Sequence, residues 1–437
     1  MPKNGYNWWH IRNQLRNQPP KIDLHSFAKH RVYEDYLMHY IEVLNSNPHI
    51  PEFPLTIVDG FAGGGVYTDP RDNSLYEGSP LKLIRAAEAG IAAVNIKRHK
   101  SLTLQAEYFF IEKKKSNHEY LKQYLSEQGF ASRFGKDIFL LDGEFTAWLD
   151  KIIRHIMGTV RGRNRRCLFF LDQYGYKDVP FRDIRAIFSK LTNAEIILTF
   201  ASDALINYLS EDPRNLKPLQ QMELGKELNI KELLENKKDN KDWRRLIQLQ
   251  LHSAIRKLSG ARYYTPFFIV SKQSHRTFWL VHLSNHPKAR DVMTQLHWDE
   301  KNDFSHYGGP GLWMFGYDPK RDERIIRMGD LFRETEFSFD ETAERKTRES
   351  IIEELPRFIH RYSDGIPVQD LYRRVANTTP ATFEHIKEIA KILLQAKELE
   401  VQGPKGKHRL KRITDGDILR LPRQKTFFPI SDLLNIK

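Results

Sequence analysis

The segment "LTIVDGFAGGGVYTDP", residues 55–70, decides the fold that the sequence predicts. An apolar run ends in Asp59, and four glycines follow within residues 60–65. Glycine has no Cβ, so such a loop lets the backbone approach a ligand closely. A strand that ends in an acid and a glycine-rich loop predicts a binding site at the carboxyl end of that strand.

The loop does not fit the common phosphate-binding motifs. A Walker loop requires Lys and then Ser or Thr after its last glycine, and here neither is present. Gly63 and Gly65 fit a dinucleotide fingerprint, but Thr68 stands at its third position. Asp59 would repel a pyrophosphate and attract a cation. S-adenosylmethionine, which carries a sulfonium and an ammonium but no phosphate, therefore suits Gly63, Gly64 and Gly65 best; a structural tight turn or another nucleotide remains the alternative.

Two further acids support this cofactor. Glu112 ends the apolar run "FFIEKK", where its carboxylate would accept both ribose hydroxyls, and Asp142 ends "LLDGE", where it would accept from the adenine amino group. Each acid alone is also typical of a solvated strand end. Three of them at successive strand ends indicate a shared cofactor site.

The fourth strand end, "FFLDQYGY", would hold the reacting amine. Amino-methyltransferases have an Asp-Pro-Pro-Tyr loop here, in which the acid accepts from the target amine and the ring stacks on the base. Asp172 and Tyr174 fit these roles, whereas Gln173 replaces a proline. Catalysis would come mainly from positioning. The alternative is a strand-to-helix turn with a surface acid.

Strands alternate with helices through residue 200, which predicts an α/β fold with a Rossmann-like, mostly parallel sheet. The segments "YYTPFFIVS" and "RTFWLVHLS" predict a reversed antiparallel hairpin that closes one edge. We expect this domain to cover residues 1–300, with a helical insertion at about 203–258. A linker would cover 301–345, and three helices with a short hairpin would fill 346–437.

Charge and composition limit the partners and the compartment. The net charge of +13 and the pI of about 9.4 favour a polyanion such as nucleic acid. The single cysteine, Cys167, excludes a disulfide framework and a multi-cysteine metal site within this chain. No signal peptide or membrane span is predicted, so we expect a cytoplasmic protein. Four histidines lie near acids, but without metalloprotease spacing we predict no metal site; they are His282, His286, His297 and His306.

The chain resembles the three-Cys-motif partner protein (TcmP) family. The matching segments are "KHRVYEDYL", "IVDGFAGGGVY", "EGSPLKLI", "FFIEKK", "FFLDQYG" and "NHPKARDVMTQLHW", between about residues 29 and 300. The resemblance implies a class I methyltransferase fold with seven strands and a reversed terminal hairpin, distantly similar to large-subunit rRNA adenine methyltransferases. It also implies that Lys29 and His30 lie near the cofactor, and that a radical-SAM-like protein with three cysteines is a partner.

One departure from the family is Gln173, because the usual loop is Asp-Pro-aromatic-Gly. Loss of the proline would leave the amine acceptor less well fixed, which puts catalysis in question more than cofactor binding.

The C-terminal part resembles the winged helix-turn-helix domain of that family. Its hairpin tip, "GPKGKHRLKR", is basic, and we expect it to contact phosphates through Lys405, Lys407, Arg409, Lys411 and Arg412. Thr378 and Thr379 precede the third helix as candidate caps. Because the exposed face of that helix is not strongly basic, a protein-contact role is the alternative.

These features together predict an S-adenosylmethionine-dependent methyltransferase that acts on nucleic acid, with an adenine exocyclic amine as the target. In a duplex, the target base would have to be flipped out. The competing hypothesis is a non-catalytic, methyltransferase-like nucleic-acid-binding or partner subunit, in phage defence for example.

Overall fold

The structure is a computed structural model of the 437-residue chain. It describes residues 19–173, 177–200, 213–239, 243–270, 277–300, 304–306, 310–313, 337–403, 406, 408–409 and 412–422. The chain forms two compact units, Met1–Tyr307 and Gly308–Lys437.

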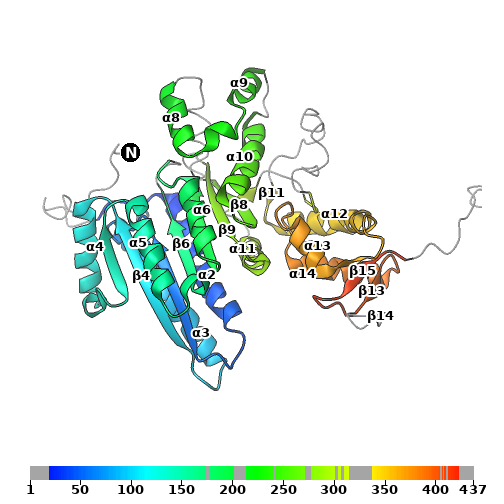
Figure 1. Ribbon diagram of the computed structural model, residues 1–437, viewed down its shortest axis with the longest axis horizontal. Coiled ribbons are helices and arrows are strands. Elements are labelled where there is room, and N and C mark those ends of the chain that lie inside the picture. The colour runs from blue at the N-terminus through cyan, green and yellow to red at the C-terminus, as the bar shows by residue number, and fades with distance from the viewer. Residues whose placement is uncertain are drawn as a thin grey trace, which may run out of the picture. The chain divides into compact units, whose positions relative to one another are not determined.

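A central sheet organises the first unit (Figure 1). Seven of its strands follow the order β5-β4-β1-β6-β7-β9-β8, and β10 pairs with β8 on the side away from β9. The first five are parallel to one another, whereas β9 runs antiparallel to both β7 and β8. The strands are β1 (Glu52–Asp59), β4 (Thr103–Glu112), β5 (Ile138–Asp142), β6 (Arg166–Leu171), β7 (Ala194–Phe200), β8 (Tyr263–Val270), β9 (Thr277–Ser284) and β10 (Phe304–His306). This mixed sheet with its reversed hairpin confirms the predicted methyltransferase-like Rossmann fold.

Helices cover both faces of the sheet. The residues of β6 alternate: Phe169 packs into the core formed with α5, α6 and α10, whereas the ring of Phe170 meets Tyr33 of α2 with centroids 5.0 Å apart. Helix α2 in turn packs on α3 and α11. The helices are α2 (Leu24–Leu44), α3 (Ser79–Ile96), α4 (Lys115–Glu127), α5 (Phe145–Gly158), α6 (Phe181–Lys190), α8 (Pro213–Gln221), α9 (Ile230–Asp239), α10 (Trp243–Ser259) and α11 (Pro287–Asp299). Helices α8, α9 and α10 lie in the segment where the sequence predicted a helical insertion.

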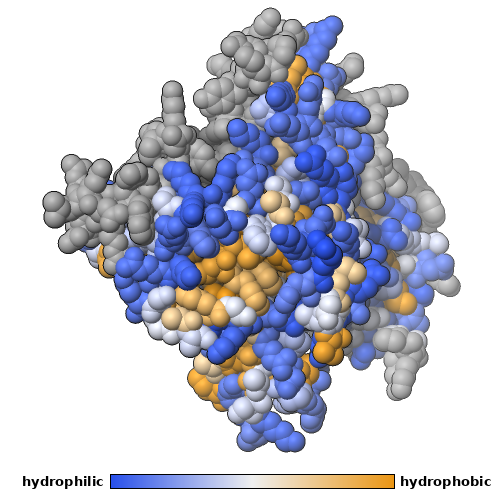
Figure 2. Space-filling view, turned by 60° about the vertical axis from the view of Figure 1, so that its left-hand side comes forward, coloured by the Kyte–Doolittle hydropathy of each residue, from blue (hydrophilic) through white to orange (hydrophobic). Residues whose placement is uncertain are grey.

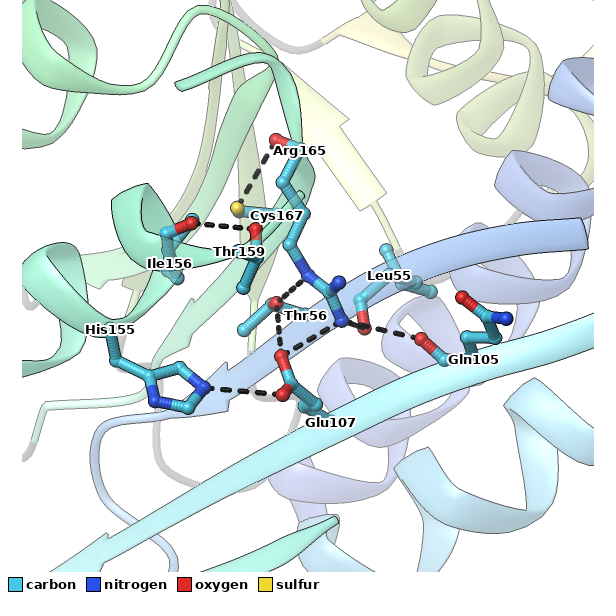
Figure 3. A network of polar contacts seen from close by, with 9 residues as sticks. All are labelled: Leu55, Thr56, Gln105, Glu107, His155, Ile156, Thr159, Arg165 and Cys167. Atoms are coloured by element: carbon cyan, nitrogen blue, oxygen red, sulfur yellow. Dashed lines mark hydrogen bonds and ion pairs between the residues drawn. The ribbon is translucent and has the colours of Figure 1, made fainter. Parts of the chain in front are cut away.

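A polar network joins three strands and a helix within the first unit (Figure 3). The buried Arg165 guanidinium donates to Thr56 Oγ1 at 2.6 Å and forms an ion pair with Glu107 at 2.8 Å. It also donates to two backbone carbonyls, and His155 of α5 contacts the other oxygen of Glu107 at 3.2 Å. Since these residues come from β1, β4, α5 and the start of β6, the network stabilises the packing of separate elements rather than a binding site.

The second unit combines helices with a small sheet. Helices α12 (Glu341–Ile359), α13 (Val368–Val375) and α14 (Phe383–Gln395) accompany strands β12 (Ile366–Pro367), β13 (Glu400–Gln402), β14 (His408–Arg409) and β15 (Ile418–Arg420), in the order β12-β15-β13-β14. The antiparallel pair β13–β14 is the predicted hairpin. A short strand, β11 (Phe337–Ser338), precedes α12.

The cap of α14 differs from the prediction. Thr382, not Thr378 or Thr379, is the N-cap, and its side chain accepts from the backbone N–H of His385 at 3.2 Å. Thr378 and Thr379 instead donate to the carbonyls of Leu312 and Gly311. These two threonines therefore stabilise the preceding segment rather than the helix end, a tertiary contact that no local sequence signal specifies.

Surface hydrophobicity is uneven. Figure 2 shows one face on which hydrophobic residues gather in a patch surrounded by hydrophilic ones. Among the described residues, no helix is both long and apolar enough to cross a membrane.

Candidate functional site

The strand register brings the predicted acids to one edge of the sheet. Asp59 aligns with Phe110 of β4 and with Phe170 of β6. Glu112 and Asp172 each lie two residues beyond those partners, and the parallel strands end at the same edge. The sheet thus collects three acidic side chains at neighbouring strand ends.

The glycine loop bends sharply above this edge. Gly63 and Gly65 have φ values of +62° and +81°, which L side chains rarely adopt. A Cβ on Gly65 would also lie 2.7 Å from a methyl carbon of Leu121. Asp59 begins the turn, because its Oδ1 accepts the backbone N–H of Phe61 at 3.0 Å. The loop conformation therefore requires glycine at residue 65.

Glu112 holds the loop in place. Its Oε2 accepts the N–H of Gly63 at 2.9 Å, and its Oε1 accepts the N–H of Lys114 at 2.7 Å. Burial raises the pKa of Glu112 above its ordinary value. Asn117 Nδ2 also lies 3.5 Å from Oε1. A carboxylate has about four acceptor positions, so a ribose hydroxyl has at least one position on Glu112, and a second hydroxyl would compete with Asn117.

Asp59 is the most buried of the acids, with 1% of its surface exposed. Its Oδ2 accepts the hydroxyl of Ser79 at 2.6 Å. Burial raises the pKa of Asp59 to about 7, and the nearby charges of Asp172 and Glu112 add to this effect. A cation beside Asp59 would reverse the shift, so the site favours a positively charged ligand group.

Asp172 is paired with Lys29. Lys29 Nζ lies 2.7 Å from both carboxylate oxygens. Burial opposes ionisation of Asp172, but the charge of Lys29 and hydrogen bonds from Lys29 and Thr199 outweigh it, so the pKa of Asp172 lies below its ordinary value. Asp172 is thus an ionised acceptor.

Lys29 and His30 come from the first turns of α2 and are both 5% exposed. The ring of His30 stacks on Tyr76 with centroids 5.7 Å apart. Lys29 lies at the strand ends beside Asp172, and the placement of Lys29 and His30 near a cofactor stays a prediction. The ion pair between Lys29 and Asp172 was missed, because residues 143 positions apart give no local signal.

The remaining predicted residues differ in their surroundings. The side chain of Asp142 is exposed, and its backbone carbonyl accepts Trp148 Nε1 at 3.0 Å. Glu112 and Asp142 are direct register partners on β4 and β5. Tyr174 lies outside the described residues. The roles of the cofactor-binding and catalytic residues stay predictions.

A second buried polar cluster was not predicted. The Tyr36 hydroxyl of α2 donates to Glu195 of β7, and His282 of β9 lies 3.1 Å from both groups. His286 instead caps α11 by accepting the N–H of Lys288. Among the described residues, no group of three potential metal ligands occurs.

The predicted phosphate-binding residues of the wing are only partly described. Arg409 contacts the fully buried Asp417 at 3.3 Å, so its charge is compensated within the unit. Arg412 is exposed. Lys405, Lys407 and Lys411 lie outside the described residues. Phosphate binding by this set stays a prediction.

Comparisons with known proteins agree with this organisation. Residues 316–406 match the GMT-like wHTH domain family. The chain is thus a methyltransferase-like Rossmann domain followed by a winged helix-turn-helix domain. Comparison with curated proteins gives no match.

Several solved structures are similar at low identity. Protein LPL1258 from Legionella pneumophila is 11% identical, with 61% of this chain and 90% of that chain covered and a TM-score of 0.34. An O-methyltransferase from Bacillus cereus, in complex with SAH, is 11% identical, with 63% and 96% covered and a TM-score of 0.30. The METTL16 MTase domain is 10% identical, with 57% and 66% covered and a TM-score of 0.26.

Proposed function

We propose that this protein is an S-adenosylmethionine-dependent methyltransferase that acts on nucleic acid, with an adenine exocyclic amine as the target. The observation that carries the proposal is the set of acids at adjacent strand ends around the glycine loop, of which Asp59 is buried. Asp59 would attract the ammonium of the cofactor, and Glu112 would accept its ribose hydroxyls. Asp142 would accept from the adenine amino group.

Asp172 would accept a hydrogen bond from the target amine. Lys29 donates one bond to each of the Asp172 oxygens and Thr199 donates a further one, and a carboxylate has about four acceptor positions, so about one position is left for the amine. An ionised acceptor orients the amine lone pair toward the methyl group, and this positioning is the main contribution we assign to the protein. Tyr174 would stack on the base, and the winged domain would contact phosphates.

The ion pair between Asp172 and Lys29 favours a second candidate function. An acceptor already paired with a buried lysine also fits a non-catalytic subunit, in which the ion pair is structural. Membership of the TcmP family, a three-cysteine radical-SAM-like partner, a role in phage defence and a cytosolic location belong to the proposal at this finer level.

Cofactor titration and methyl transfer test the proposal together. Calorimetry should detect S-adenosylmethionine binding, and ATP should bind no better. Labelled methyl groups should then transfer to DNA or RNA. ATP binding without any response to S-adenosylmethionine would contradict the cofactor assignment, and cofactor binding without transfer to any nucleic acid would favour the non-catalytic subunit.

The ion pair between Lys29 and Asp172 decides which substitution of Asp172 is the better test. Removal of the whole carboxylate in Asp172→Ala would leave Lys29 as an uncompensated buried charge, which costs about 3–5 kcal/mol. Asp172→Asn also removes the negative charge, but it keeps the shape and one oxygen that can accept from Lys29, so we expect near-normal cofactor affinity and transfer reduced by about two to three orders of magnitude. Asp150→Asn is the matched control, because that side chain of α5 is exposed and pairs with Lys190 at the surface, and it should keep wild-type activity.

A further inference from the structure

Gln173 departs from the proline that the resemblance predicts, and the structure gives it a definite contact. It directly follows Asp172 at the end of β6, and only 1% of its surface is exposed. Its Oε1 accepts the backbone N–H groups of Asp178 at 2.9 Å and Val179 at 3.2 Å. We refer to these two bonds as the Gln173 contact.

The far end of this contact is fixed in the hydrophobic core. Val179 is fully buried in the same cluster as Phe181, the first residue of α6. Gln173 therefore connects the end of β6 to a buried position just before α6. Proline would restrict only its own φ and that of the residue before it, whereas the Gln173 contact fixes the two ends of the connection relative to each other.

The side-chain amide has one orientation that satisfies these bonds. Both backbone groups are donors, so the oxygen must face them and the nitrogen must face the opposite way. Among the described residues, Gln173 Nε2 is buried without a hydrogen-bond partner. An unsatisfied buried donor costs about 1–3 kcal/mol. The two bonds that Oε1 accepts offset this cost, since each net hydrogen bond contributes about 0.5–1.5 kcal/mol.

We infer that Gln173 is a positioning residue for Asp172. The carboxylate is held from the side of α2 by Lys29, and the backbone that carries it is held by the Gln173 contact. Two independent restraints fix the acceptor, one on its side chain and one on its main chain. The expected loss of rigidity from the missing proline is offset by this contact. The inference rests on the proposed function of Asp172.

Hydrogen exchange measures the contact without any need for activity. In Gln173→Met, which has similar size but no acceptor, the amides of Asp178 and Val179 should exchange at least about tenfold faster, since 1.4 kcal/mol corresponds to a factor of ten. Gln173→Glu keeps an acceptor oxygen and should restore slow exchange. Gln123→Met is the matched control, because this exposed side chain of α4 contacts only Glu127 in the described hydrogen bonds.

Kinetics measures the positioning role. In Gln173→Met the kcat for methyl transfer should fall by about ten- to a hundredfold while the Kd for S-adenosylmethionine changes less than twofold, the pattern for a lost transition-state interaction. Unchanged exchange in Gln173→Met would overturn the inference, and so would faster exchange with wild-type kcat. If the wild-type protein transfers no methyl group, the proposed function fails, and wild-type exchange rates in Gln173→Met would show separately that the contact does not exist.

Discussion

At the residue scale, Asp59 would link binding of the proposed cofactor to the proton concentration. Its pKa of about 7 means that the carboxyl is mostly protonated below pH 7. A cation stabilises the ionised form and lowers the pKa of Asp59, so binding of the proposed cofactor there below pH 7 would release a proton.

We therefore expect the affinity for S-adenosylmethionine to weaken as the pH falls from 8 to 5.5. The slope should approach about tenfold per pH unit below pH 7, where one proton is released. Calorimetry in buffers of different ionisation enthalpy will count that proton. Asp59→Asn is the control, and it should bind more weakly without this pH dependence; an equal dependence in that variant would assign the proton to another group, such as a histidine.

The acids themselves could be predicted from the sequence, but their contacts could not. Parallel strands end at a common edge, so Asp59, Glu112 and Asp172 had to lie near one another once the apolar runs were identified. The bond from Gly63 to Glu112 joins residues 49 positions apart. This bond forms only because the glycine loop bends toward the end of β4, and no local sequence pattern specifies that bend.

At the element scale, the glycine loop depends on the space that α4 leaves for it. Gly65 has a φ of +81°, and a Cβ there would lie 2.7 Å from Leu121 of α4. Gly129 has a similar φ of +89°, but a Cβ on it would meet nothing within 4 Å. Substitution of Gly129 thus measures the cost of backbone strain alone, whereas substitution of Gly65 measures strain together with a steric overlap.

We expect Gly129→Ala to lower the free energy of unfolding by about 1 kcal/mol, the usual cost of a left-handed L residue. Gly65→Ala should cost about 1–3 kcal/mol more, because the added methyl group overlaps Leu121. Urea denaturation of both variants measures the difference. Equal losses would mean that the contact with α4 adjusts without cost.

The Arg165 network should contribute to the free energy of unfolding, because it connects neighbouring strands. Arg165→Met removes the guanidinium between β1 and β4 and leaves Glu107, whose side chain is 22% exposed, without that partner. We expect a loss of about 3 kcal/mol, as for one member of a buried ion pair. Arg161→Met, an exposed change nearby, should alter stability by less than about 0.5 kcal/mol. Thermal unfolding will show whether the two differ.

Elements were easier to predict than their ends. Residues 26–45 carry apolar residues at helical spacing, which predicts a helix there, and the structure has it at Leu24–Leu44. The continuous apolar runs likewise predict the buried strands. The cap of α14 was placed three or four residues too early, because Thr378 and Thr379 have the same intrinsic capping ability as Thr382. Their contacts with Leu312 and Gly311 distinguish them from Thr382.

At the scale of the whole molecule, the basic wing should provide a salt-dependent part of nucleic-acid binding. Simultaneous substitution of Lys405, Lys407 and Lys411 by alanine should weaken nucleic-acid binding. The slope of log K against log salt concentration should become less steep by about 2–3, since each phosphate contact contributes about 0.9 to it. Arg409 is excluded from this set because it neutralises Asp417 within the unit.

A triple variant of the first unit provides the matched control. Lys97, Lys100 and Lys136 are exposed, and their replacement by alanine changes the net charge equally. Filter binding across a salt series should leave the slope of this control near that of wild type. Identical slopes for the two triple variants would indicate that the wing makes protein contacts instead.

The strand order also determines what the growing chain exposes during synthesis. β7, which is buried along its whole length, ends at Phe200, but its neighbour β9 ends only at Ser284. At about 5–20 residues per second, the ribosome adds the intervening segment on the order of ten seconds later. Throughout that interval the apolar edge of β7 has no strand beside it, and open edges of this kind pair readily with other chains. Aggregation during translation should therefore depend on the speed at which residues 201–284 are synthesised.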